Sequence, residues 1–471
     1  MTVSPCRSNF VVEQKDLYQF LLAVQENCIK NSCRQIVSIS LAIDLVDPLI
    51  VFDNLAQANE IKFYFEHKGK GEAIAAIDAV KKIQINGEDR FDQAEYFIQS
   101  HAKNIITFGD KKAAFTGAHF FCYFSFFDQP HQIDYPFPSA TVFLPRWQIS
   151  VKKEQCFLVT NTIINANFNI QLFLQKLSHK IETIHSLKPY SPNIDYFPAI
   201  LTKKSVKNTE HFKLSVVSAL EKINSSHLSK IVLADVLDVN SNQNFNLFNS
   251  LNNLRKIHPN CYIFSTSNGK GQSFIGASPE RLISIHNQQL ITDALAGSAP
   301  RGKTPAEDAV NANRLLNSEK ERHEHLLVMN FITQRLTQLG LLPQVLAPRL
   351  RQLSNIQHLW TPISAIVPAN VHPLKIVAQL HPTPAVAGAA RDVACAEIRR
   401  YENFERGLYA APLGWVDSQG NCEFIVGIRS ALIDGDRARL YAGAGIVAGS
   451  DPEREFAEIQ LKLQALLKAL V

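Results

Sequence analysis

The sequence has few of the features that mark membrane, exported or nucleic-acid-binding proteins. Its longest apolar stretch, residues 36–52, is interrupted by Asp44 and Asp47 and is shorter than the roughly 20 residues of a membrane span. We interpret it as two strands. The start of the chain lacks a positive segment followed by an apolar one and carries acidic residues, which argues against a signal or transit peptide. We therefore expect a cytoplasmic protein that does not enter a membrane.

Basic runs and metal-binding cysteine patterns are also missing. The net charge is only +5 over 471 residues, without a Lys/Arg stretch interleaved with aromatic residues, so nucleic-acid binding is not expected. Of the eight scattered cysteines, the close pair Cys28 and Cys33 has no second pair to complete a zinc site. We expect reduced, mostly buried thiols.

The composition is that of a globular protein, with 46% hydrophobic and 19% charged residues. Segments rich in Val, Ile and Phe predict strands over residues 34–164, interrupted by helices near 72–82 and 92–102; another helix is expected at 170–184. The polar stretch 185–208, which contains three prolines, is the best candidate for a boundary. It separates a sheet-rich scaffold, residues 1–200, from a second region, residues 205–471, and we expect the two to intertwine in one structural domain.

The second region predicts alternating helices and strands. Helices are expected at 210–223, 246–257, in one long segment at 305–339, and from 451 onward, with strands between them. Asp434, Gly435 and Asp436 between two apolar runs are typical of a β-hairpin. Adjacent hairpin strands indicate antiparallel sheets packed by helices, which is an α+β fold.

Two carboxylates lie on the apolar face of the helix predicted near residue 318. At about 100° per residue, Glu321 and Glu324 project from the same face as Leu327, Val328 and Phe331. A buried carboxylate needs a cation, hydrogen-bond donors or a wet cavity. Alternatively, the helix has already emerged into solvent at Glu324.

The last helix offers a second pair of carboxylates. Glu455, Glu458 and Lys462 follow the edge of its apolar stripe, although Glu458 and Lys462 also form the (i, i+4) pair of any solvated helix. Two helices that each offer carboxylates three residues apart predict an oxygen-rich site for a hard cation such as Mg²⁺.

Gly443, Gly445 and Gly449 imitate a dinucleotide-binding fingerprint. A single helix consumes the remaining chain, so the second parallel strand of such a fold cannot follow. The loop is either a bare turn or a place where backbone N–H groups hold a carboxylate.

Several strings together resemble the chorismate-utilising enzymes, and among them the isochorismate synthases. They occur in a consistent order and are SKIVLA (229–234), IGASPERL (275–282), TDALAGSAPRG (292–302), SEKERHEH (318–325), QHLWT (357–361), LHPTPAVAG (380–388), GIRSA (427–431), YAGAGIV (441–447) and SDPEREFAEIQLK (450–462). The N-terminal half is less diagnostic. The resemblance implies the fold of anthranilate synthase component I, with large antiparallel sheets packed together and flanked by helices.

The resemblance also implies the nucleophile. Relatives that add water carry Lys where this chain has Lys230, whereas ammonia-adding relatives usually have Gln. Relatives that use a lysine nucleophile place it where this chain has Ala296. Lys230 would act as general base on a water attacking C2 of chorismate, and Glu280 as general acid at the departing C4 hydroxyl, with exchanged roles in the reverse reaction. No glutamine amidotransferase partner is expected.

The remaining site residues are likewise implied by the family's motifs. Glu324 and Glu458 match magnesium ligands, with Glu321 and Glu455 beside them through water. Positions that match substrate contacts are Gly297 and Lys462 at the ring carboxylate, Arg429 and Gly443 at the enolpyruvyl carboxylate, and Ser298 and His358 in the site lining. Ser298 replaces a common Thr and keeps the hydroxyl, whereas Gly449 stands where an acidic residue is frequent. His358 alternatively orients the metal ligands or packs beside Trp360.

The sequence thus predicts a Mg²⁺-dependent, reversible isochorismate synthase. Its product would feed menaquinone or phylloquinone synthesis, with siderophore synthesis as the other destination. A salicylate synthase, which eliminates pyruvate in the same pocket, and a non-catalytic chorismate-binding paralogue are the competing interpretations. The family's default state, a monomer, is expected.

Overall fold

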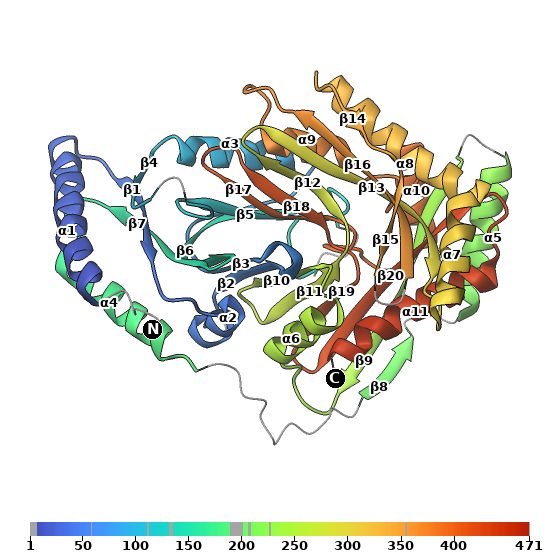
Figure 1. The fold of residues 1–471 in the computed structure, drawn as a ribbon, viewed down its shortest axis with the longest axis horizontal. Helices are drawn as coiled ribbons and strands as arrows, with labels where there is room; N and C mark the ends of the chain where they lie inside the picture. Colours follow the sequence, from blue (N-terminus) through green and yellow to red (C-terminus); the bar gives the residue numbers. More distant parts are fainter. Residues whose placement is uncertain are drawn as a thin grey trace.

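The computed structural model describes residues 7–57, 59–110, 113–130, 135–188, 201–205, 209–225, 228–353 and 356–470. Its strands join into one continuous, branched sheet with helices at both ends and along its faces (Figure 1). The branch point is the long strand β6 (Ala140–Lys152), which pairs with β3, β5 and β7.

Two arms of the sheet diverge from β6. The first arm contains, in spatial order, β3 (Glu72–Ile85), β2 (Ile61–His67), β10 (Tyr262–Asn268), β11 (Gln272–Ser278), β19 (Ser430–Asp434), β20 (Arg437–Val447), β9 (Lys230–Ser241) and β8 (Leu201–Ser205). The second contains β5 (His119–Phe124), β17 (Pro412–Asp417), β18 (Cys422–Val426), β12 (Arg281–His286), β13 (Gln289–Pro300) and β16 (Ile356–Ile366), with β14 (Gln344–Val345) and β15 (Arg349–Gln352) at its edge.

On its remaining side, β6 continues through β7 (Gln155–Ile164) and β1 (Gln35–Ala42) to β4 (Ile105–Phe108). The β1–β4 pair is parallel, and every other described pair is antiparallel. The predicted α+β fold with a large antiparallel sheet is therefore confirmed.

Helices group at the two ends of the molecule (Figure 1). At one end lie α1 (Arg7–Lys30) and α4 (Ile170–Ser186); at the other lie α5 (Thr209–Ser225), α7 (Pro305–Asn317), α8 (Glu319–Gln338) and α11 (Pro452–Leu470). The remaining helical elements are α2 (Pro48–Leu55), the short turn η1 (Lys68–Lys70), α3 (Arg90–Ala102), α6 (Leu247–Ile257), α9 (Pro373–Leu380) and α10 (Arg391–Tyr401). Within the described ranges, no helix combines the length and apolar character that a membrane crossing requires.

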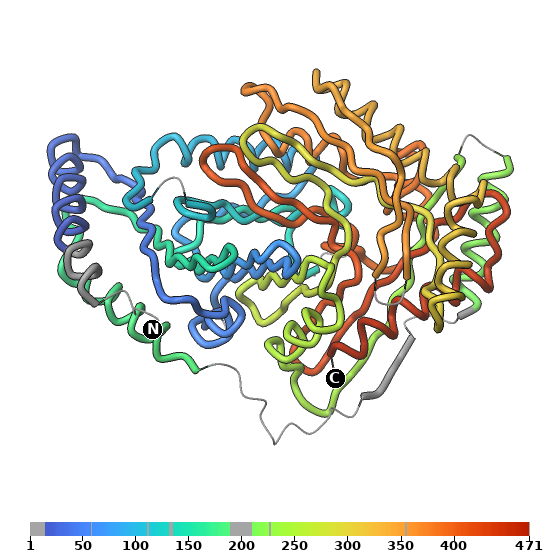
Figure 2. Tube along the Cα trace, viewed as in Figure 1, coloured from blue at the N-terminus to red at the C-terminus, as the bar shows by residue number. Residues whose placement is uncertain are grey.

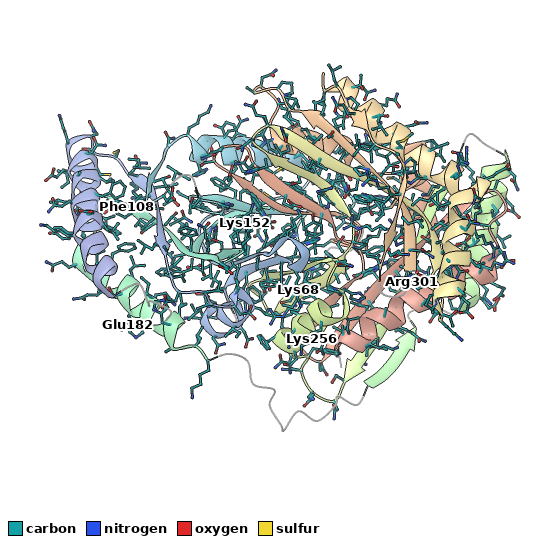
Figure 3. The ribbon with its side chains drawn as sticks, viewed as in Figure 1. Lys68, Phe108, Lys152, Glu182, Lys256 and Arg301 are labelled. Carbon is teal, nitrogen blue, oxygen red and sulfur yellow. The ribbon has the colours of Figure 1, made fainter. Side chains whose placement is uncertain are left out.

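The two halves of the sequence share strand pairs and one core. Phe65 of β2 faces Phe264 of β10, and Phe121 of β5 faces Trp415 of β17, so N- and C-terminal segments lie side by side (Figure 2). Side chains fill the space between the elements (Figure 3). Most of the predicted boundary, residues 189–200 and 206–208, lies outside the described residues, and the division into two regions stays a prediction.

Residues 36–52 form a strand and a helix, so the prediction of two strands is wrong for the second segment. The side chain of Asp47 accepts a hydrogen bond from Leu49 N, and Pro48 occupies the first helical turn. An Asp cap followed by Pro is a helix start. This local signal outweighs the strand preference of the Ile and Val residues behind it.

The helix predicted at residues 72–82 is also wrong, because this segment lies within β3. Its residues pair on one side with β2 and on the other with β6, and Ala73–Ile77 are buried. The Ala-rich composition favours a helix only weakly, and two neighbouring strands override it. The helix predicted at 92–102 is confirmed as α3, whereas α1 was not predicted.

The long helical segment predicted at 305–339 is interrupted at Ser318. This residue ends α7, and its hydroxyl accepts a hydrogen bond from Glu321 N as the N-cap of α8. Ser with Glu three residues later is the pattern of a capping box. The other helices predicted in this half are confirmed as α5, α6 and α11, and the predicted hairpin joins β19 to β20 with Gly435 at φ +59.

Candidate active site

A cavity of about 730 Å³ opens where the chain crosses between the two arms of the sheet. The connection from β11 to β12 carries Glu280 to this point, and the return connection from β18 to β19 carries Arg429. Two backbone hydrogen bonds join these connections: Val426 N donates to Glu280 O and Ala277 N donates to Arg429 O, each at 3.1 Å. β13, β16, β20, α7, α8 and α11 complete the walls.

The structure brings the residues predicted for the site together. Those that line the cavity are Glu280, Gly297, Ser298, Glu321, Glu324, His358, Arg429, Gly443, Glu455, Glu458 and Lys462. Lys230 lies directly behind this lining and touches it through Glu324. Their chemical roles stay predictions.

Lys230 is a buried cation paired with a buried carboxylate. Its side chain is 1% exposed, and Nζ donates to Glu324 Oε1 at 2.7 Å. Burial by itself would raise the pKa of Glu324, but the charge and hydrogen bond of Lys230 outweigh it and lower that pKa. A Cβ on Gly445 would lie 3.1 Å from Glu324 Oε1 and 3.2 Å from Lys230 Cε, so glycine in β20 leaves room for the pair.

The carboxylates of α8 face the cavity and not bulk solvent. The Glu324 side chain is only 14% exposed, which rules out the alternative that α8 has emerged into water there. Glu321 Oε2 accepts from Ser298 N at 3.0 Å. Burial, followed by the nearby Glu324 charge, raises the pKa of Glu321.

The carboxylates of α11 lie against lysines. Glu458 pairs with Lys462 of the same helix at 2.7 Å, and Glu455 pairs with Lys320 of α8 at 3.6 Å. Burial, with a contribution from Glu458, raises the pKa of Glu455. The two helices therefore hold their acidic faces close enough to influence each other's protonation.

These carboxylates suit a hard cation by donor type. Within the described residues, no three His, Cys, Asp or Glu side chains converge tightly enough to hold a metal ion alone. Mg²⁺ generally takes one or two protein carboxylates and completes its shell with water and substrate oxygens. Glutamates whose charges raise one another's pKa in a shared cavity fit such a partly formed site.

Glu280 is a buried carboxyl group whose pKa is raised above neutral pH. The residue is 4% exposed, and burial raises its pKa to about 8, with a further increase from Asp293 and partial compensation by Lys230 and Arg351. A carboxyl group that keeps its proton at pH 7 is suited to act as a general acid.

A chain of hydrogen-bonding groups joins the two arms at the cavity. Arg429 Nη2 lies 3.4 Å from His358 Nε2, and His358 Nδ1 lies 2.9 Å from Ser298 Oγ. Arg429 Nη1 is buried without a hydrogen-bond partner among the described residues. A buried guanidinium N–H without a partner is costly, and an anionic ligand in the cavity would satisfy it. His358 contacts Ser298 and Arg429 through its two ring nitrogens, and the alternative roles suggested for it stay predictions.

Glycines shape the wall on both sides. Gly297 has φ +78 at a register shift between β13 and β16, and a Cβ there would lie 3.1 Å from Glu321 O. Gly443 and Gly445 lie inside β20, antiparallel to β9. Lys462 Nζ donates to Gly443 O at 2.8 Å. The antiparallel setting supports the rejection of a dinucleotide site.

Several charged groups near the cavity are not among the residues predicted from the sequence. Lys320 lies within the SEKERHEH string. Its position four residues before Glu324 would have placed it on the same helix face as that carboxylate. Asp293 of β13 raises the pKa of Glu280, and Arg351 of β15 lowers it. No local sequence pattern marks these two residues. Arg314 of α7 also lines the cavity, on a helix whose predicted pattern gave it no role.

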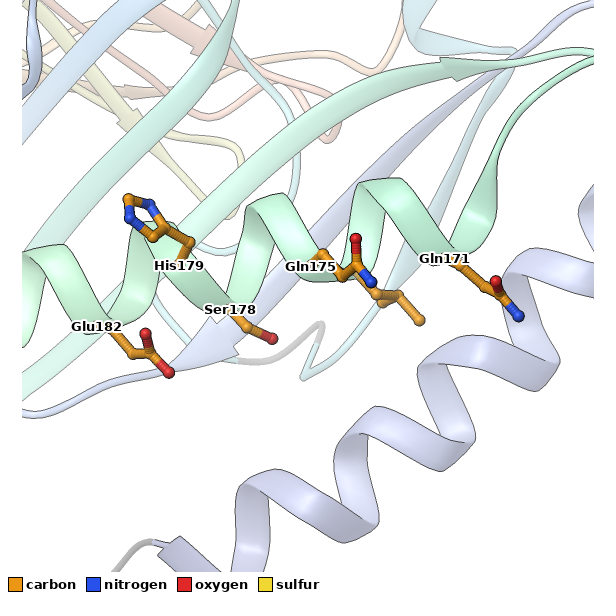
Figure 4. Close-up of a pocket in the computed structure, with 6 residues that line it drawn as sticks. Gln171, Gln175, Ser178, His179 and Glu182 are labelled. Carbon is orange, nitrogen blue, oxygen red and sulfur yellow. The ribbon is translucent and has the colours of Figure 1, made fainter.

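A second cavity, of about 440 Å³, lies on α4 at the opposite end of the molecule (Figures 1 and 4). Its lining comes from one helix and consists of Gln171, Leu174, Gln175, Ser178, His179 and Glu182. These side chains lie along a single helix (Figure 4), so among the described residues no second element contributes to the lining.

Comparison with known proteins gives one family. Residues 23–471 match the family described as "Chorismate binding enzyme". The chain is 38% identical over 267 residues to the "Salicylate biosynthesis isochorismate synthase" of Pseudomonas aeruginosa, a match that spans only 56% of each chain. It is 32% identical over 335 residues to "Isochorismate synthase MenF" of Bacillus subtilis, covering 71% of this chain and 70% of that protein.

Solved structures agree with this match. MenF of Escherichia coli, described as a menaquinone-specific isochorismate synthase, superposes with a TM-score of 0.79 at 26% identity, covering 98% of this chain and 100% of that one. Anthranilate synthase component I of Streptococcus pneumoniae, at 20% identity and a TM-score of 0.70, shares the fold. The matched family model, the relatives and the cavity together show that the chain belongs to the chorismate binding enzyme family.

Proposed function

We propose that the protein is an isochorismate synthase, which adds water at C2 of chorismate and releases the C4 hydroxyl. The observation that carries the proposal is that the buried carboxyl of Glu280, whose pKa burial raises to about 8, lines the same cavity as Glu324, which pairs with the buried Lys230. The names of the B. subtilis and E. coli proteins support it.

The acid and the base act at two carbons of one ring. Glu280, which keeps its proton at neutral pH, gives that proton to the departing C4 hydroxyl. Lys230 must first lose the proton of its ion pair with Glu324, and it then takes a proton from the water that attacks C2. In the reverse direction Glu280 accepts the proton and Lys230 supplies one. Isochorismate therefore returns to chorismate in the same site.

Fixed donors hold the carboxylates of the substrate. Arg429 Nη1 lacks a partner among the described residues and is available for the enolpyruvyl carboxylate, beside the backbone of Gly443. Gly297 and Lys462 serve the ring carboxylate. Charge-assisted hydrogen bonds from Arg to a carboxylate are among the stronger polar contacts in proteins.

The carboxylates of α8 and α11 would hold Mg²⁺. We assign direct contacts to Glu324 and Glu458, and contacts through water to Glu321 and Glu455. When bound, the ion supplies positive charge that stabilises the ring carboxylate while the double bonds shift.

Two variants test the assignment of roles. Lys230→Ala and Glu280→Gln should each lower kcat by at least about 10²-fold, the usual contribution of a general acid or base. Glu182→Gln, on α4 at the other end of the molecule, is the control and should leave kcat unchanged. Full turnover by either site variant would refute the assigned role.

We place the product in menaquinone synthesis because the full-length structural match is to a menaquinone-specific enzyme. Phylloquinone or siderophore synthesis as the destination of the product, the cytoplasmic location, the monomeric state and the lack of an amidotransferase partner stay predictions.

A further inference from the structure

Ser298, His358 and Arg429 form a connected set in the cavity. Ser298 and His358 face each other across β13 and β16, beside the register shift at Gly297. A bulge re-aims neighbouring side chains, and here it directs the Ser298 hydroxyl to the ring of His358, with Oγ 2.9 Å from Nδ1. The other ring nitrogen faces Arg429 at 3.4 Å.

The chemistry of the guanidinium fixes the direction of these hydrogen bonds. Arg can only donate, so the His358 Nε2 that it faces must be unprotonated and accept. Burial, together with the charges of Arg429 and Lys462, keeps the pKa of His358 well below its usual value, so the ring is neutral. A neutral imidazole carries one proton, which must then reside on Nδ1.

The proton on His358 Nδ1 sets the direction of the hydrogen bond with the Ser298 hydroxyl. Because His358 Nδ1–H donates, Ser298 Oγ accepts, and its own proton remains available for another partner. Both Ser298 and Arg429 line the cavity, and Arg429 Nη1 has no hydrogen-bond partner among the described residues. The Ser298 hydroxyl and the Arg429 guanidinium, which both contact the His358 ring, can therefore each donate a hydrogen bond to a carboxylate.

We propose that His358 is a positioning residue that holds Ser298 as a hydrogen-bond donor, beside Arg429, to a carboxylate in the cavity. The proposal rests on the proposed function for the identity of that carboxylate as one of the two in chorismate. The tautomer of His358 and the donor direction of Ser298 are inferred from the hydrogen-bond geometry alone.

Substitutions that separate the two ring nitrogens test this arrangement. The side-chain amide of His358→Asn lies near the position of Nδ1 and can still donate to Ser298, whereas that of His358→Gln reaches the position of Nε2. We expect Ser298→Ala and His358→Gln each to weaken chorismate binding about tenfold, the loss of one hydrogen bond to a charged group. His358→Asn and Ser298→Thr should remain within about threefold of the unmodified protein.

The double variant distinguishes positioning from a general structural role. Chorismate binding is measured by calorimetry with EDTA present, kcat and KM with Mg²⁺, and thermal unfolding for every variant. In the Ser298→Ala background, His358→Gln should cause little further loss of affinity, because the hydroxyl that His358 orients is gone. The proposal would be overturned if the two substitutions reduced the affinity for chorismate independently, so that their effects multiply. It would also be overturned if the His358→Asn variant bound chorismate as weakly as the His358→Gln variant.

A direct readout of the tautomer does not depend on turnover. In the full-length protein labelled with ¹⁵N-histidine, the His358 signals are identified by their loss in His358→Asn. The proposal expects Nδ1 to be protonated and Nε2 bare; a proton on Nε2 would refute it. If unmodified protein shows this tautomer but does not convert chorismate, the proposed function fails and the positioning role stands.

Discussion

At the scale of single residues, the buried carboxyl of Glu280 links stability to pH. Its pKa is about 8 in the folded protein against an ordinary value of 4.5. Between these values the unfolded chain loses the proton and the folded one keeps it, so the stabilisation is present below pH 4.5 and is lost as pH rises to about 8. Turnover, which needs the protonated acid, should also fall as pH rises through about 8.

Glu280→Gln cannot ionise and should escape this loss. We expect its free energy of unfolding, relative to that of the unmodified protein, to rise between pH 5 and pH 9 by on the order of a few kcal/mol. Urea unfolding across this pH range measures the difference. A difference that does not change with pH would show that Glu280 has an ordinary pKa.

Gly445 tests the space around the Lys230–Glu324 pair. A methyl group at this position would lie 3.1 Å from the Glu324 carboxylate oxygen, so Gly445→Ala should displace the pair. Small displacements of catalytic groups cost about 10²-fold in rate, and we expect kcat to fall by that order with the thermal midpoint nearly unchanged. Steady-state kinetics that match the unmodified protein would contradict the packing described here.

At the scale of elements, α2 shows how a cap decides between helix and strand. Asp47 caps α2 and also forms two hydrogen bonds with Arg255 of α6. Asp47→Asn keeps a capping side chain but removes the charge, whereas Asp47→Ala removes both functions. We expect Asp47→Ala to cost about 1 kcal/mol more than Asp47→Asn in the free energy of unfolding. Equal losses by urea unfolding would mean that the cap contributes nothing.

The sequence was sufficient for elements with strong local signals and insufficient where distant strands decide. The helix face of Glu321 and Glu324 could be predicted from periodicity, and the hairpin at Gly435 from its turn residues. The strand β3 could not be predicted from the sequence, because its alanine residues take their conformation from the neighbouring strands β2 and β6. The Lys230–Glu324 ion pair joins residues far apart in the chain, so the family resemblance and not any local pattern indicated that they share a site.

At the scale of the whole molecule, the catalytic region depends on N-terminal strands. β10 pairs with β2, and β17 pairs with β5, so residues 209–470 alone would expose two long strand edges and the aromatic side chains between them. Exposed apolar edges of this kind favour aggregation.

We therefore expect the fragment 209–470 to lack cooperative unfolding when it is produced alone. Circular dichroism during heating, together with gel filtration, measures this. A monomeric fragment with a sharp transition would show that the second region folds independently, as a separate domain.

The central claim, that the cavity adds water to chorismate and stops at isochorismate, depends on the identity of the product. The purified protein is incubated with chorismate and Mg²⁺, and the products are separated over time. We predict an equilibrium mixture of chorismate and isochorismate, reached from either compound and lost when Mg²⁺ is chelated. Accumulation of salicylate and pyruvate without a second enzyme, or recovery of unchanged chorismate, would contradict the account.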